Sequence, residues 1–463
     1  MNFEVLGDQG ARPSASVRLS DLLGALSYAL DLTEGQPAGH CIRATYIAHH
    51  IGKRIGLPDL QLWELYYTVM LKDLGCSSNA ARICELYLSD DIGFKHDFKT
   101  LGTSLPKVLA FVVSHTGRKS PLGERLKAIL NILQNGGEIV DEMIETRCHR
   151  GAEIAAALRF PKAVSEGIHA LDEHWNGEGR PDRRAGPAIP LYARIALLAQ
   201  VADVFHSAAG PKAALAEIEA RAGNWFDPHL AMVFAEVASE PGFWDAFAQT
   251  DFADRVAGME PPGNLIRVDE DYLDEIAQAF AQVIDSKSPF TSGHSERVAV
   301  YAEMTARKLG HSDADCRWLK RAALLHDIGK LGVSNAILDK NGKLDDAEWV
   351  AMRSHADLSE KILSRVPIFS EMALIGGAHH EKLDGRGYPR GLKENEIDER
   401  TRIVSVADVF DALTADRPYR KAMPLEKALS IMRSEVGTSF DGRCLAALED
   451  AIAEAEIGLA RAA

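Results

Sequence analysis

The apolar residues of the chain recur mostly at steps of three and four positions, the spacing that places them on one face of an α-helix. In residues 269–284 the apolar positions are Leu273, Ile276, Ala277, Phe280 and Ile284. In residues 316–330 the stripe runs through Leu319, Ala322, Ala323 and His326. Alternating stretches rich in Val, Ile and Thr, typical of strands, are short and rare. The pattern predicts an all-α protein.

Several motifs occur twice along the chain, in the same order. The paired segments are GHCIRATYIAHHIGKRIG at 39 and GHSERVAVYAEMTARKLG at 293, LKDLGC at 71 and LHDIGK at 325, DEHWNGEGRP at 172 and HEKLDGRGYP at 380, VADVF at 201 and again at 406, and GNWFD at 223 and GTSFD at 437. Five ordered matches predict a duplicated helical unit, with a first and a second copy.

The copies differ in length. The first two matched pairs are 254 residues apart and the third pair is 208 apart, so the first copy carries an insertion, near residues 89–120. Gly, Pro and mixed charge weaken the helical periodicity there. The prolines of MEPPGN, at 259–264, interrupt the pattern between the copies. We therefore expect two tandem helical domains, at residues 1–258 and 265–463.

Composition and charge exclude some classes of function and location. The chain has 463 residues, 46% of them hydrophobic and 26% charged, with a formal net charge of −15. That charge argues against binding to polymeric nucleic acid. Six scattered cysteines without a CxxC pair suit reduced thiols in a cytosol. Neither a signal peptide nor an apolar run of about 18 residues is visible, so we expect a cytoplasmic protein without membrane insertion.

The second copy places titratable side chains on inward faces. His326 extends the apolar stripe that begins at Leu319, and Lys330 lies four residues later on the same face. The other inward polar residues are Asp327, His294, His355, His379, His380 and Asp408. A lone buried histidine is usually satisfied by hydrogen bonds, but five histidines with two carboxylates favour metal coordination. Imidazole and carboxylate without thiolate favour iron or manganese over a structural zinc.

Seven ligands suit two divalent metals bridged by a carboxylate. Such a pair lowers the pKa of bound water, so that hydroxide forms, and stabilises charge on a phosphoryl oxygen. HDIGK at 326 followed by HHEKLDGRGYP at 379 resembles the HD-GYP subgroup of the HD phosphohydrolase superfamily, roughly over residues 271–452. The resemblance implies an all-helical fold, two or three metals and hydrolysis of cyclic di-GMP or, in some members, cyclic GMP-AMP.

The resemblance also implies roles for individual residues. The implied metal ligands are His294, His326, Asp327, His355, His379, His380 and Asp408. Asp327 would bridge the metals and Lys330 would contact the scissile phosphate, so we take these two as catalytic. The implied substrate contacts are Tyr388 and Gly387, in a turn that Gly385 permits, with Arg417 and Arg420; without the resemblance these arginines read as an exposed basic loop. Three-metal members carry a glutamate where this chain has Phe290, so we predict two metals.

The first copy has lost most of these ligands and resembles a degenerate HD domain. The replacements are Lys72 for His326, Cys76 for Lys330, Arg147 for His355, Leu171 for His379 and Asp172 for His380. The matched His40, Asp73 and Asp203 are too few to hold two metals. The new charges either pair internally where metals once sat or form a regulatory site for an anion or nucleotide.

The sequence thus favours a metal-dependent phosphodiesterase acting on cyclic di-GMP. Cyclic GMP-AMP or another nucleotide phosphoester is the alternative substrate. Two different classes of protein, a non-catalytic signalling scaffold and a dimetal oxygenase, compete with this interpretation, and the intact ligand set with Lys330 argues against the scaffold. Besides the cyclic dinucleotide, a second copy of the chain or a signalling protein is left open as a partner.

Overall fold

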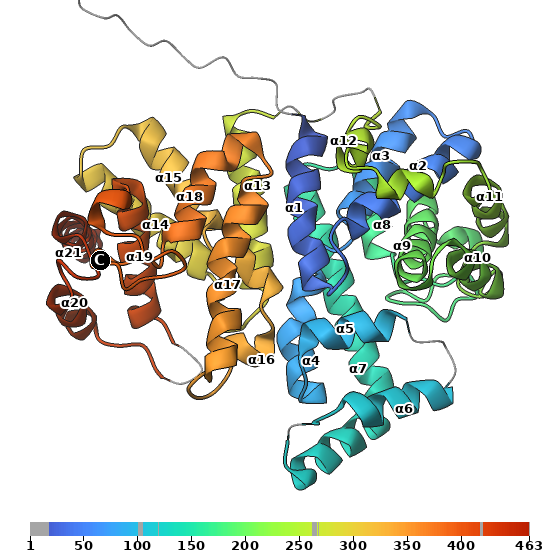
Figure 1. Ribbon diagram of the computed structural model, residues 1–463, viewed down its shortest axis with the longest axis horizontal. Helices are drawn as coiled ribbons and strands as arrows, with labels where there is room; N and C mark the ends of the chain where they lie inside the picture. Colours follow the sequence, from blue (N-terminus) through green and yellow to red (C-terminus); the bar gives the residue numbers. More distant parts are fainter. Residues whose placement is uncertain are drawn as a thin grey trace, which may run out of the picture.

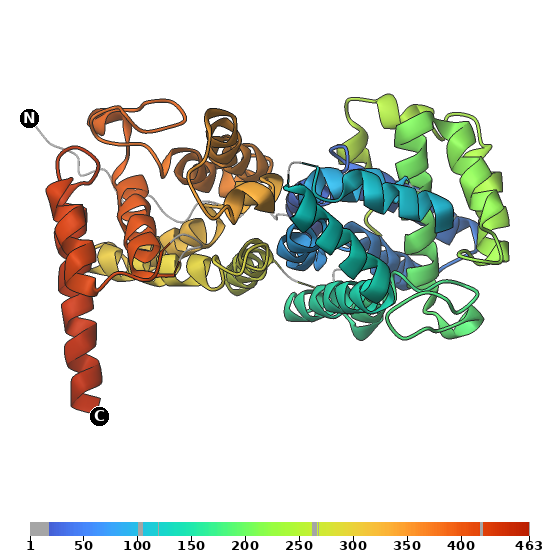
Figure 2. The ribbon, with the colours of Figure 1, turned by 90° about the horizontal axis from the view of Figure 1, so that it is seen from below.

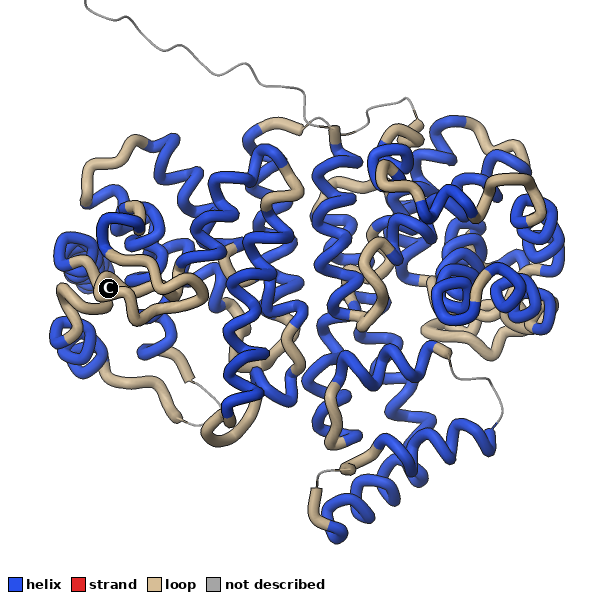
Figure 3. The backbone as a smooth tube through the Cα atoms, in the orientation of Figure 1, coloured by secondary structure: helices blue, strands red, loops and turns tan. Residues whose placement is uncertain are grey.

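The structure is a computed structural model that describes residues 18–100, 105–118, 120–261, 266, 268–416 and 420–462. This described part contains helices and loops and no strand (Figure 3). The all-α prediction is confirmed. Among the described helices, none combines the length and apolar character needed to cross a bilayer.

The described part of the first half holds twelve α-helices and three short 3-10 helices. They are α1 (Leu19–Thr33), α2 (His40–Arg54), α3 (Asp59–Met70), η1 (Cys76–Asn79), α4 (Ala80–Tyr87), α5 (Asp91–Lys99), α6 (Leu105–His115), α7 (Leu122–Ala157), α8 (Lys162–His169), η2 (Gly186–Ala188), α9 (Leu191–Ala209), α10 (Pro211–Ala220), α11 (Pro228–Ala238), η3 (Asp245–Ala248) and α12 (Phe252–Ala257).

The second half repeats this order without the insertion. Its elements are α13 (Glu270–Asp285), α14 (His294–Lys308), α15 (Asp313–Leu325), η4 (Ile328–Gly332), α16 (Asn335–Leu338), α17 (Asp346–Leu363), η5 (Pro367–Phe369), α18 (Ser370–Ala378), η6 (Glu394–Glu396), α19 (Glu399–Thr414), α20 (Leu425–Ser434) and α21 (Gly442–Ala462). Figure 2 shows α21 projecting from the end of this half.

Local sequence explains where the helices begin. The carboxylate of Asp269 accepts a hydrogen bond from the Tyr272 amide and so caps α13. Asp345 caps α17 in the same way, and the Glu348 carboxylate in turn accepts a hydrogen bond from the Asp345 amide. The stripe predicted for residues 269–284 is the buried face of α13.

Equivalent glycines meet equivalent neighbours in the two halves, which supports the duplication. A Cβ added to Gly75 would strike the carbonyl of Arg147, and one added to Gly329 would strike that of His355. Only glycine lets η1 approach α7, or η4 approach α17, so closely. The pairs Gly75/Gly329 and Arg147/His355 keep the separations of 254 and 208 residues found in the sequence.

The insertion folds as a helical lobe. It comprises α4–α6 with the first part of α7, which extend away from the rest of the first half (Figure 1). Its small separate core consists of Ile83, Leu86, Tyr87, Phe94, Phe111, Val112, Ile132 and Ile139. The weak periodicity of this region hid these helices, because short helices around a small core need few apolar positions.

The two copies share one core. A single cluster of buried apolar residues runs through both halves, and α1 packs against η4 and α17 of the second copy (Figure 1). The Tyr272 hydroxyl of α13 donates to the Leu158 carbonyl, 3.0 Å away. The division at residues 258 and 265 stays a prediction.

Candidate active site

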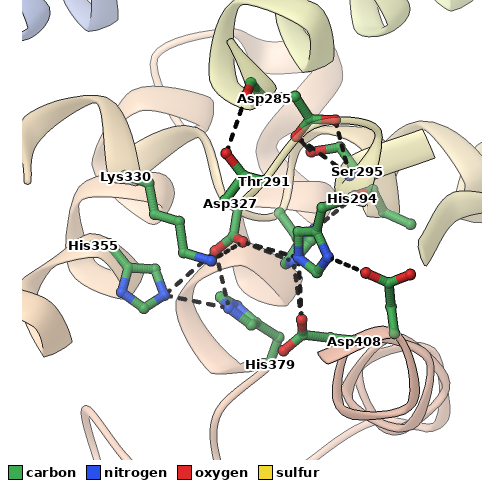
Figure 4. Close-up of polar contacts among 12 residues, drawn as sticks. Asp285, Thr291, His294, Ser295, Asp327, Lys330, His355, His379 and Asp408 are labelled. Atoms are coloured by element: carbon green, nitrogen blue, oxygen red, sulfur yellow. Dashed lines mark hydrogen bonds and ion pairs between the residues drawn. The ribbon is translucent and has the colours of Figure 1, made fainter. Parts of the chain in front are cut away.

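Five helices of the second copy bring the seven inward residues of the sequence prediction together, and Figure 4 shows five of them, His294, Asp327, His355, His379 and Asp408. One histidine begins α14, a histidine and an aspartate follow α15, one histidine lies within α17, two follow α18, and one aspartate lies in α19. In that order they are His294, His326, Asp327, His355, His379, His380 and Asp408. All except His380 are buried.

Asp327 lies at the centre of this cluster. Its Oδ2 lies 3.5 Å from Nε2 of His294 and 3.3 Å from Nε2 of His326. Its Oδ1 lies 3.4 Å from Nε2 of His355 and 3.6 Å from Nε2 of His379. One carboxylate therefore faces two groups of potential ligands, the arrangement that a bridging ligand requires.

Asp408 and His380 complete the two groups. Asp408 Oδ1 lies 3.3 Å from His294 Nε2 and 3.9 Å from His326 Nε2. Donor atoms of Asp327, His355, His379 and His380 all lie within 4.8 Å of one another, as do those of His294, His326 and Asp327. A third group, His326, His379 and Asp408, is equally close, so the two sets adjoin each other.

Backbone carbonyls orient three of the histidines. Nδ1 of His326, His355 and His379 each lies 2.6–2.9 Å from the carbonyl oxygen three residues earlier in the chain. An Nδ1–H that donates to a carbonyl leaves Nε2 as the lone-pair nitrogen. All three imidazoles thus direct Nε2 toward Asp327.

His294 is oriented by a carboxylate that the sequence prediction missed. Asp411, one turn after Asp408 on α19, accepts from His294 Nδ1 at 2.7 Å and from Arg297 Nε at 2.6 Å. Asp285 accepts from the amide and the hydroxyl of Ser295 and fixes the start of α14. An arginine three residues after the histidine was the available signal for Asp411, because a buried carboxylate needs such a partner.

The first copy repeats this arrangement and corrects one sequence match. The two VADVF segments pair Asp203 with Asp408. In the structure Asp203 instead occupies the place of Asp411: it accepts from a histidine Nδ1 at 2.7 Å and an arginine Nε at 2.6 Å. Gln200 then corresponds to Asp408, at the separation of 208 residues. Three residues approximate one helical turn, so either register leaves the apolar positions on one face.

The donor set fits divalent cations. His294 Nε2, His326 Nε2 and Asp327 Oδ1 are buried and have no hydrogen-bond partner among the described residues. Such orphaned atoms are costly unless something coordinates them. Although burial opposes its charge, His326 and Lys330 hold the pKa of Asp327 well below its usual range. Burial, only partly offset by Asp327, lowers the pKa of His355 to about 3, so its imidazole is neutral and ready to bind a metal.

Lys330 and Tyr388 lie at the edge of the cluster. The Lys330 ammonium pairs with Asp327 Oδ2, and the Tyr388 ring lies 4.8 Å from that of His380. Gly387 permits the turn, because a Cβ there would collide with the backbone of Glu381 and Lys382. Lys330 and Tyr388 thus both lie beside the cluster. Their contacts with a substrate stay predictions.

The structure does not place the two arginines predicted to contact the substrate beside the cluster. Arg417 lies outside the described residues. Arg420 donates to the carbonyls of Ala412 and Leu413 at the end of α19, so its guanidinium is already engaged. Arg353, which the sequence prediction did not consider, is exposed and lies 5.3 Å from the centre of the Tyr388 ring. Phe290, which stands where three-metal relatives carry a glutamate, lines a groove together with Asp285. It belongs to none of the groups of potential metal ligands.

In the first copy an ammonium group lies at the position that matches His326. Lys72 Nζ is fully buried, pairs with Asp73 and lies 3.0 Å from His40 Nε2. Despite burial, Asp73 raises the pKa of Lys72 above its usual value. Arg147 pairs with Asp172. Lys72 and Arg147 thus each have an internal partner, as one of the two sequence interpretations expected.

Comparisons with known proteins agree with this picture. A family model described as HD domain matches residues 124–230 and 278–444. The chain is 54% identical over 434 residues, 94% of both chains, to the 3′3′-cGAMP-specific phosphodiesterase 3 of Vibrio cholerae serotype O1. It is 40% identical over 173 residues, 37% of this chain and 47% of the other, to a cyclic di-GMP phosphodiesterase of Thermotoga maritima. A crystal structure of a cyclic GMP-AMP specific phosphodiesterase of V. cholerae superimposes with a TM-score of 0.66 and 49% identity, over 95% of this chain and 98% of the other.

Proposed function

The chain belongs to the HD domain family and, within it, to the HD-GYP-type cyclic dinucleotide phosphodiesterases, and on this basis we propose that it hydrolyses 3′3′-cyclic GMP-AMP. The identity of 54% over 94% of both chains to a phosphodiesterase specific for that molecule carries the proposal. Membership of this enzyme family sets aside the non-catalytic scaffold.

Cyclic di-GMP, which the sequence alone favoured, is the second candidate substrate. Relatives that act on it match only part of this chain, for example 37% of it at 40% identity. We rank it second because those relatives match a smaller part of this chain, and at lower identity, than the relative specific for 3′3′-cyclic GMP-AMP does.

HD-domain phosphohydrolases depend on metals, and we propose that this chain holds two divalent cations, iron or manganese, between nitrogen and oxygen donors. One cation would be held by His294, His326, Asp327 and Asp408, and the other by Asp327, His355, His379 and His380. When bound, the cations supply a lowered pKa for coordinated water and stabilise charge on the phosphoryl oxygen.

The remaining residues position the substrate. The Lys330 ammonium lies beside Asp327, where it would neutralise charge on the scissile phosphate. Tyr388 offers a flat ring beside His380 for a purine. Arg353, held over that ring, is the described cation best placed for the second phosphate or a guanine edge.

Product analysis tests the proposal. Manganese- or iron-loaded protein is incubated with each cyclic dinucleotide, and the products are separated by chromatography. We expect a higher kcat/KM for 3′3′-cyclic GMP-AMP; an equal or higher value for cyclic di-GMP would overturn the choice of substrate. Asp327→Asn should abolish turnover, whereas Asp73→Asn, at the matched position of the first copy, should retain it. Turnover that survives Asp327→Asn would remove the site from the reaction.

A further inference from the structure

The first copy contains a cavity of about 450 Å³ directly over its lost metal site. Cys76, Arg147, Asp172 and Gln200 line the floor of the cavity, and they correspond to Lys330, His355, His380 and Asp408. The volume lies within the range of small-molecule sites. The insertion, which the second copy lacks, provides part of the opposite wall, and the following part of α7 provides the rest.

That opposite wall is mainly apolar. Side chains from α4, α5 and α7 line it, among them Ile83, Tyr87, Phe94, Met143 and Ile144. Leu197, Val201 and Val204 of α9 face the cavity as well. A molecule in this cavity buries most of its surface against apolar side chains. Binding is therefore favourable only if most of that surface is itself apolar.

Cations outnumber anions among the side chains that line the cavity: they are Lys95, Lys99, Arg147, Arg180 and Arg221 against Glu34, Asp172 and Glu178. Lys95 Nζ lies 3.1 Å and Lys99 Nζ 2.6 Å from the carboxylate of Glu34, and Arg147 pairs with Asp172. The Lys72–Asp73 pair lies below them, and Arg180 and Arg221 pair with Asp141 and Glu217, which lie outside the lining. His40 adds no charge, because burial and Lys72 lower the pKa of its imidazole.

A predominantly cationic lining favours an anionic group over a cationic one in the cavity. Gln200 adds a second indication of a ligand. Its side chain is 7% exposed, lines the cavity, and its Oε1 has no hydrogen-bond partner among the described residues. Because rotation exchanges the oxygen and nitrogen of the amide, Gln200 can present a donor to an anion.

We propose that this cavity binds a small amphipathic carboxylate, with its apolar body against the insertion and its carboxylate at Arg147 and Lys99. A second cyclic dinucleotide fits poorly, since it carries two phosphates and many polar edges against an apolar wall. A metal fits poorly too: Glu34, Asp73 and Cys76 lie within 4.8 Å of one another, but lysines already neutralise both carboxylates.

Calorimetric titration of the full chain with decanoate tests the proposal, with decyltrimethylammonium as a probe of equal apolar length and opposite charge. We expect saturable binding of one decanoate per chain and no saturable binding of the cation. Displacement of 1-anilinonaphthalene-8-sulfonate, an aromatic anion, by decanoate would show that aliphatic and aromatic bodies share the site. Absence of saturable decanoate binding, or equal binding of both decyl probes, would overturn the proposal.

Two matched variants locate the site. Val140 lines the cavity but is 42% exposed, so a charged residue there is compatible with folding. Val140→Glu should weaken decanoate binding about fivefold through repulsion at the cavity mouth, and Val140→Lys should not weaken it. Arg147→Gln should weaken it at least tenfold. Equal affinities in the Val140→Glu and Val140→Lys proteins would contradict the assignment, whether or not Arg147→Gln folds.

Discussion

Replacing Asp411 with asparagine tests whether this carboxylate acts on the metal centre through His294. Asp411 serves two donors, His294 Nδ1 at 2.7 Å and Arg297 Nε at 2.6 Å. An asparagine of the same shape has one acceptor oxygen, so one donor loses its partner. Leaving a buried donor unpaired costs about 1–3 kcal/mol of stability. Loss of the hydrogen bond that orients a metal-binding histidine lowers metal affinity about 10- to 100-fold.

Asp203→Asn is the matched control, because Asp203 makes the same two contacts at 2.7 and 2.6 Å in the first copy. Thermal unfolding of the metal-free proteins gives the structural cost, and calorimetric titration with Mn²⁺ gives the affinity. Both variants should lose similar stability, and only Asp411→Asn should lose affinity. Unchanged manganese affinity in Asp411→Asn, or an equal loss in Asp203→Asn, would refute the reasoning.

Four further outcomes follow from the structure. Burial lowers the pKa of His49 to about 4 in the folded protein. As the pH falls, the His49 imidazole is therefore protonated in the unfolded chain before it is protonated in the folded one. The free energy of unfolding should fall by about 1.4 kcal/mol per pH unit between about pH 6.5 and pH 4. His49→Gln should therefore lose less stability than the parent between pH 7 and 5 in urea unfolding; equal losses would contradict this. Asp91 of the first copy accepts hydrogen bonds from the start of α16 in the second copy. Asp91→Asn should therefore lower the free energy of unfolding by about 1–3 kcal/mol, measured by thermal unfolding. An unchanged melting temperature would argue against that contact. Lys330→Met should lower kcat about 100- to 1000-fold while elemental analysis finds the metal content unchanged, and loss of metal would instead make Lys330 a structural residue. With Phe290 in place of a glutamate, the same analysis should find two ions per chain, and three would disprove the two-metal prediction.

The gathering of the seven inward residues was largely predictable, because residue type and spacing indicated which side chains point into the core. A histidine that continues an apolar stripe, as His326 does, must point into the core. Asp411 was missed because it lies one helical turn after Asp408 on the same face of α19. Apolar periodicity cannot tell a carboxylate that orients a histidine from one that would bind a metal. The Asp203 match was shifted for the same reason: moving a helix by one turn preserves its apolar face.

The sequence by itself determined the all-α class, the duplication and the seven inward residues of the second copy, since all three follow from periodicity and repeated spacing. Only the tertiary structure decided that Asp327 faces both groups of histidines, that Lys72 pairs inside the first copy, and that the insertion encloses a cavity there. Those outcomes depend on distances between side chains from helices far apart in the chain. Packing of whole helices sets such distances, and periodicity within a single helix carries no information about them.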